Sequence, residues 1–166
     1  MLLPVAARYC GAHAGRSRVI LPYNRRVISL ELARELKVAQ LPWRPRRGDL
    51  VMDRLNIAFI VLQDGTDDSG AVEIDTAQGV ERRPSLGLTW IPRLDHLLTF
   101  LVRHGPFDLS VRPVSEGSRS NQWQVTLSDA PAATKRAFTA SDSGEAAGQA
   151  LHYLLSQAAW RPGPAL

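Results

Sequence analysis

Cysteine, lysine and long apolar runs are all scarce in this chain of 166 residues. The single cysteine, Cys10, excludes an internal disulfide, so we expect a reducing, cytoplasmic environment. Uninterrupted apolar runs fall far short of the roughly 20 residues that span a bilayer, so we expect no membrane contact. The net charge of +4 comes almost entirely from arginine, because Lys37 and Lys135 are the only lysines.

Motifs for catalysis and metal binding are missing as well. The chain has no G-x-x-x-x-G-K-[ST] phosphate loop, no G-x-G-x-x-G dinucleotide fingerprint and no G-x-S-x-G nucleophile elbow. One cysteine and four dispersed histidines do not form a standard structural zinc site, so we expect neither a metal nor a cofactor. These absences favour a protein without enzymatic activity. An enzyme whose site assembles from distant residues is the alternative.

What the chain does contain is regular apolar periodicity. Ser29 is placed to cap a first helix, and Pro92 suits the first helical position of a second. Asp142 and Glu145 have the spacing of a capping box at the start of a third. The apolar stripe in each segment recurs at spacings of three and four residues. The helices are predicted over residues 29–39, 90–105 and 141–160.

Two groups of strand patterns separate these helices. In both groups, β-branched and aromatic residues are bounded by turn formers, and the connections are short enough for antiparallel meanders. The sequence therefore predicts an α+β fold in the order α-βββ-α-βββ-α. The expected strands are residues 49–55, 57–63 and 71–75, with 80–88 as a further candidate, and then residues 107–114, 122–128 and 135–140.

The predicted organisation is one α+β domain over residues 28–159. Residues 1–27 form a basic extension with five arginines and no acidic residue, within which "RVILPY" is a candidate edge strand. Residues 160–166 form a C-terminal tail. The extension is either a basic arm for an acidic partner or a segment without a ligand.

The stretch "LPWRPRRGDL", residues 41–50, combines an indole with three arginines. Pro42 ends the first helix, because the residue before a proline disfavours helical backbone. We expect Trp43 to fill the junction between helix and strand, and Gly48 and Asp49 to begin the strand. Trp-x-Pro occurs again at Trp90, which we expect in the core, and at residue 160.

These clusters suggest two kinds of partner. Tryptophan and arginine are typical anchors of protein interfaces, so we expect a module that works through protein contacts, including self-association as a homodimer. Nucleic-acid binding is the alternative, since bases stack on indoles and arginines hold phosphates. The candidate contact residues for either partner are Trp43, Arg44, Arg46, Arg47, Arg25, Arg26 and Trp160.

Four stretches also carry a resemblance to known proteins: "ISLELARELKVAQLPWRPRRGDL", "WIPRLDHLL", "WQVTL" and "SGEAAGQALHYLL". They resemble a family of small, functionally uncharacterised bacterial proteins, of actinobacterial type, with Trp-x-Pro motifs. Members often carry a label from pilus assembly, but this chain lacks the nucleotide-binding loop that an ATPase of that kind needs. The resemblance implies a shared fold and supplies no reaction.

Overall fold

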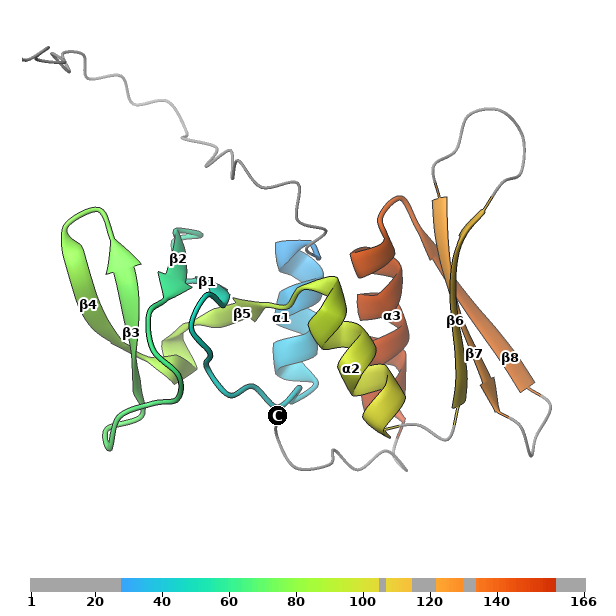
Figure 1. Ribbon diagram of the computed structural model, residues 1–166, viewed down its shortest axis with the longest axis horizontal. Helices are drawn as coiled ribbons and strands as arrows, with labels where there is room; N and C mark the ends of the chain where they lie inside the picture. Colours follow the sequence, from blue (N-terminus) through green and yellow to red (C-terminus); the bar gives the residue numbers. More distant parts are fainter. Residues whose placement is uncertain (1–27, 105–106, 115–121, 130–133, 158–166) are drawn as a thin grey trace, which may run out of the picture.

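A computed structural model describes residues 28–104, 107–114, 122–129 and 134–157, shown in colour in Figure 1. Three α-helices and two antiparallel sheets occupy these ranges, which confirms the predicted α+β class. The elements in chain order are α1 (Leu30–Val38), β1 (Leu50–Met52), β2 (Ala58–Val61), β3 (Ala71–Thr76), β4 (Gly79–Pro84), the 3-10 turn η1 (Ser85–Gly87), β5 (Thr89–Ile91), α2 (Leu94–His104), β6 (Phe107–Val114), β7 (Gln122–Asp129), β8 (Thr134–Ala140) and α3 (Ser143–Ser156).

The helices lie between the two sheets (Figure 1). The sheet of β1 to β5 is on one side of the helices, and the sheet of β6 to β8 is on the other. Helix α3 packs on β7 and β8, whereas α1 packs against β5 and α3. The three-stranded sheet thus packs its face on the helical layer, whereas the five-stranded sheet contacts the helices mainly through its edge strand β5.

The five-stranded sheet has the order β4-β3-β2-β1-β5, so its last strand returns to pair with its first. Val51 in β1 stands opposite Phe59 in β2 on one side and Trp90 in β5 on the other. Asn56, with a φ of 64°, lies in the turn from β1 into β2. In the turn before β3, the carboxylate of Asp67 accepts hydrogen bonds from three donors of Ser69 and Ala71.

The three-stranded sheet is a meander in the order β6-β7-β8. Val125 of β7 is paired with Val111 and Phe138, and the three side chains share one face. That face packs against α3, because Val111 and Phe138 contact the cluster in which Val125 is buried. Apolar and polar residues alternate along β7, so one face of this sheet is buried and the other is more exposed.

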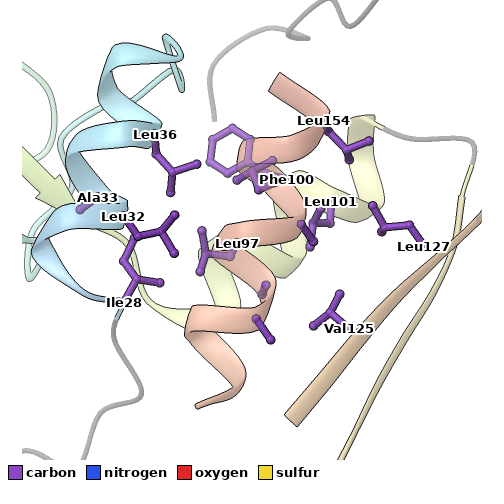
Figure 2. Close-up of a cluster of buried hydrophobic side chains, with 14 of the residues drawn as sticks. Ile28, Leu32, Ala33, Leu36, Leu97, Phe100, Leu101, Val125, Leu127 and Leu154 are labelled. Carbon is purple, nitrogen blue, oxygen red and sulfur yellow. The ribbon is translucent and has the colours of Figure 1, made fainter. Parts of the chain in front are cut away.

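The interior is divided into two clusters of buried side chains. The helix cluster lies between the helices and β7, and Figure 2 shows side chains of α1, α2, α3 and β7 pointing toward one another. It comprises Ile28, Leu32, Ala33, Leu36, Ile91, Leu97, Phe100, Leu101, Val125, Leu127, Ala146, Ala147, Ala150, Leu151 and Leu154. The smaller sheet cluster belongs to the five-stranded sheet and comprises Val51, Phe59, Val61, Val72, Ile74 and Leu88.

Helices α1 and α3 approach closely at Gly148. A Cβ atom at this position would lie 2.7 Å from Cδ2 of Leu32, so any residue other than glycine forces the Leu32 side chain to shift. The close approach brings Glu145 of α3 to the start of α1, where its carboxylate accepts hydrogen bonds from Ser29 N (2.8 Å) and Ser29 Oγ (2.9 Å). Ser29 Oγ in turn accepts a hydrogen bond from Leu32 N, which confirms the predicted N-cap of α1.

The capping box expected for α3 is wrong. Asp142 does cap the helix, through a hydrogen bond from Gly144 N (2.6 Å), but Glu145 binds Ser29 instead of the backbone of Asp142. The reason is that Ser29 N begins a helix and has no intrahelical acceptor. A carboxylate within reach satisfies this N–H and also binds the hydroxyl of the same residue.

Two further expectations about element boundaries differ from the structure. Five strands precede α2: the further candidate at residues 80–88 forms β4, and β5 adds to the predicted strands. Helix α2 begins at Leu94, so Pro92 lies before it and not at its first position. Pairing explains both, since Trp90 and Ile91 form a ladder with β1 and are therefore extended. Residues 1–27 and 160–166, and the predicted roles of both segments, lie outside the described residues.

Candidate functional site

Two tryptophans from distant parts of the chain stack where the five-stranded sheet meets the helices. Trp43 lies in the loop between α1 and β1, and Trp90 lies in β5. Their ring centroids are 6.1 Å apart with an interplanar angle of 12°. Both rings are half-buried and both contact the sheet cluster, while Trp90 also packs against the helix cluster. The Trp pair, Trp43 and Trp90, therefore joins the two hydrophobic clusters.

A buried carboxylate holds Trp43 in place. Asp49 is only 5% exposed, and its Oδ2 accepts hydrogen bonds from Trp43 Nε1 (2.8 Å) and Arg46 N (3.0 Å). The chain turns back at Gly48, whose φ of +88° is in the region that favours glycine. Asp49 N then donates to Arg46 O, which closes the turn. The predicted role of Trp43 as a filler of this junction agrees with these contacts.

Trp90 is packed on its other side by residues of α2. The ring centroids of Trp90 and His96 are 5.3 Å apart, and those of Trp90 and Phe100 are 6.4 Å apart. Trp90 Nε1 and His96 Nδ1 are buried and have no hydrogen-bond partner among the described residues. A cavity of about 20 Å³ lies between Trp43, Trp90 and His96, which is room for about one water molecule. Burial lowers the pKa of His96, against the opposing charges of Asp95 and Asp49.

An apolar groove of about 210 Å³ opens beside the Trp pair, between α1 and the end of the five-stranded sheet. Leu86 at this groove is 88% exposed, so the groove is open to solvent on that side. The lining is mostly apolar or aromatic and consists of Ala33, Leu36, Lys37, Leu41, Trp43, Pro45, Thr66, Ser85, Leu86, Leu88, Trp90 and Pro92.

Lys37 is the only titratable residue in the lining of the apolar groove. Its Nζ donates hydrogen bonds to the carbonyl oxygens of Leu86 and Leu88, both at 2.7 Å. Partial burial and the nearby positive charge of Arg54 lower the pKa of Lys37. The ammonium group thus ties α1 to the segment around η1 and helps to keep the groove in shape.

A second hollow, the arginine shelf, is continuous with the groove. It has a volume of about 560 Å³ and shares Trp43, Pro45 and Thr66 with the groove. The remaining lining residues of the shelf are Arg44, Arg46, Asp64 and Gly65. Backbone hydrogen bonds hold its two walls together, from Arg47 N to Asp64 Oδ1 and from Gly65 N to Pro45 O, both at 2.7 Å.

The structure brings four of the seven candidate contact residues together. Trp43, Arg44 and Arg46 line the arginine shelf, and Arg47 is exposed beside it. No pattern in the sequence assigned Leu86 or Lys37 to a site, and Trp90 was expected in the core. The recurring Trp-x-Pro motif was the signal that could have linked Trp90 to Trp43. Arg25, Arg26 and Trp160 lie outside the described residues.

Charge is distributed unevenly along the chain. All five arginines of residues 1–27 come before the first acidic residue, Glu31. Among the described residues, by contrast, carboxylates slightly outnumber lysine and arginine. In this part of the chain, no group of three or more His, Cys, Asp or Glu side chains is arranged to hold a metal ion. None of its helices combines the length and the apolar character that crossing a membrane requires.

Comparison with known proteins gives this chain no relative: no protein-family model, no curated protein and no solved structure matches it. The resemblance to the Trp-x-Pro family therefore stays a prediction from the sequence.

Proposed function

We propose that this chain is a non-enzymatic protein-interaction module that binds an apolar side chain of its partner in the apolar groove. The observation that carries the proposal is the solvent-open groove next to the stacked indoles of Trp43 and Trp90. Interfaces concentrate their binding energy at aromatic anchors and at pockets that exclude water. A groove of this composition gains free energy from burying an apolar group, at about 25 cal/mol for each Å² removed from water.

The size and chemistry of the groove support binding of a side chain over turnover of a metabolite. The groove alone, at about 210 Å³, falls below the roughly 300–1,000 Å³ of sites for small molecules, although it opens onto the arginine shelf of about 560 Å³. Its one titratable group, Lys37, already donates to two carbonyl oxygens. A general acid or base needs a free group within reach of the substrate, and the described residues that line the groove offer none.

The partner in this proposal is either another protein or a second copy of the chain, and the proposed location is the cytoplasm. A second copy of the chain is one of the two partners considered because several apolar side chains are exposed, among them Val38 and Leu55. Sedimentation velocity of the full chain over a hundredfold range of concentration separates the two cases. A sedimentation coefficient that rises with concentration identifies self-association.

The groove itself is tested by selection from a library of random 12-residue peptides displayed on phage, with the full chain as bait. Selected peptides are then synthesised, and their affinities are measured by fluorescence polarisation. We expect Leu86→Asp to weaken binding by about tenfold or more, equivalent to about 1.4 kcal/mol, because it puts a charge at the groove. The fold should tolerate this change, since Leu86 is 88% exposed.

Val80→Asp is the matched control. Val80 is 64% exposed and lies in β4, outside the lining of the groove and the shelf. We expect this variant to bind selected peptides within about twofold of the wild type. The proposal is wrong if the library yields no binder and the chain does not self-associate, or if Leu86→Asp binds the peptides as well as the wild type does.

Nucleic-acid binding is the second candidate, favoured by the exposed Arg44, Arg46 and Arg47 beside an indole. It is tested with a fluorescein-labelled 20-nucleotide oligo(dT) at increasing salt. The candidate predicts an affinity that falls with salt, with a log–log slope of about −0.7 for each phosphate neutralised. Absence of binding at low salt would exclude it.

A further inference from the structure

We infer that the partner segment carries a carboxylate close to the apolar side chain that enters the groove, and that Arg44 and Arg46 bind this carboxylate. The inference rests on the proposed function and names the chemistry of the partner. The apolar groove and the arginine shelf share Trp43, Pro45 and Thr66, so the two surfaces are continuous. This continuity is the basis of the inference. A peptide bound in the groove can therefore extend onto the shelf.

The two arginines of the shelf differ from the two arginines of β4 in lacking a side-chain partner within the described residues. Arg82 pairs with Glu73, and Arg83 pairs with both Asp53 and Glu81. Arg44 and Arg46 are exposed, and their guanidinium groups make no hydrogen bond or ion pair within the described residues. The shelf therefore carries two guanidinium groups without an ion-pair partner, in a part of the chain where carboxylates outnumber lysine and arginine.

The carboxylates near the shelf are already engaged. Asp49 is buried, and its Oδ2 accepts from Trp43 Nε1 and from Arg46 N. Asp64 accepts from the backbone of Arg47. Neither Asp49 nor Asp64 forms an ion pair with Arg44 or Arg46, so the shelf keeps a local positive charge. A guanidinium group matches a carboxylate in shape and can bind it through two N–H groups.

The same surroundings favour one or two carboxylates over a polyanion. Asp64 lines the shelf, and the turn that follows it carries Asp67 and Asp68, both exposed. A nucleic-acid strand that reached Arg44 would bring further phosphates close to these three side chains, and like charges repel. A peptide with an apolar residue and an acidic residue one or two positions away avoids this repulsion and uses both surfaces. Along an extended peptide, this separation is about 3–7 Å.

The peptide selection described above also tests this inference. Among selected peptides, we expect Asp or Glu to be enriched within two positions of the apolar residue that binding requires. In one selected peptide, replacing this acid by its neutral amide should weaken binding to the wild type by about fivefold. The same replacement should have little effect on binding to the double variant Arg44→Gln/Arg46→Gln.

The control double variant is Arg103→Gln/Arg112→Gln, which removes the same charge outside the groove and the shelf. Both of its positions are exposed, in α2 and β6, and it should bind the acidic peptide as the wild type does. If selected peptides need the groove but show no acidic preference, the inference is wrong and the proposed function stands. If no peptide binds and the chain does not self-associate, both are wrong. Binding of oligo(dT) that requires Arg44 and Arg46 and displaces the peptides would overturn the inference in favour of nucleic acid.

Discussion

The hydrogen bond from Trp43 to Asp49 fixes the position of the Trp43 ring at the site. The substitution Trp43→Phe removes this hydrogen bond. The smaller ring can still stack on Trp90 but lacks the N–H that donates to Asp49 Oδ2 over 2.8 Å. A hydrogen bond to a charged group contributes about 1.5–3 kcal/mol, and Oδ2 keeps the bond from Arg46 N. We therefore expect Trp43→Phe to lower the free energy of unfolding by about 1–3 kcal/mol. For a protein of this length, each kcal/mol corresponds to about 2–4 °C in Tm.

The partner substitution, Asp49→Ala, removes the acceptor and leaves two donors, Trp43 Nε1 and Arg46 N, without it. Each buried donor that loses its acceptor costs about 1–3 kcal/mol. In the double variant, one of these donors is gone as well, so the two effects should fall short of additivity by about 1 kcal/mol or more. This coupling is the quantity that reports on the bond.

Urea denaturation followed by far-UV circular dichroism measures these free energies without relying on tryptophan fluorescence, which the substitution changes. The control pairs Asp49→Ala with Trp123→Phe. Trp123 lies in β7 of the other sheet, so these two effects should add. The reasoning is refuted if Trp43→Phe changes stability by less than about 0.5 kcal/mol and is additive with Asp49→Ala.

Three further substitutions test the helical layer and its border with the Trp pair. Glu145→Gln should lower the free energy of unfolding by about 1–2 kcal/mol in urea denaturation, because it weakens the bonds to Ser29, and it should be non-additive with Ser29→Ala. Gly148→Val should lower Tm by several degrees in calorimetry, since even a Cβ atom would lie 2.7 Å from Leu32 Cδ2; an unchanged Tm would contradict the close approach of α1 and α3. Burial lowers the pKa of His96 below its unfolded value of about 6.5, so the unfolded chain takes up a proton first and stability should fall as pH drops below about 6.5. His96→Asn should remove this component, and identical pH profiles of unfolding for the two proteins would show that His96 does not contribute it.

Local patterns in the sequence were sufficient to predict the helices, most strands and the fold class. Apolar spacing and the cap at Ser29 depend on neighbours within one or two turns, and the structure keeps them. Strand β5 could not be predicted in the same way, because Trp90 and Ile91 are extended only through their pairing with β1. Glu145 shows the same limit, since its partner Ser29 is 116 positions away in sequence.

The candidate site was predictable in part for a similar reason. Trp43 and its neighbouring arginines are contiguous, so composition alone singled them out. The groove exists only because Leu86 and Lys37 are brought next to the indoles by the fold. Nothing in the local sequence around Leu86 distinguishes it from an ordinary exposed leucine, and no periodicity links it to α1.

The interior is divided into two clusters, so the molecule has two units that can unfold locally at different free energies. Among the described residues, the sheet cluster has six buried side chains, whereas the helix cluster has fifteen and draws on all three helices. Local opening follows such differences in buried contacts, so amide hydrogens of β2 to β4 should exchange with solvent faster than those of α2 and α3. The groove lies on the border between these units. A partner bound there would slow exchange in the weaker unit most, and ordering of the five-stranded sheet would become part of the free energy of recognition.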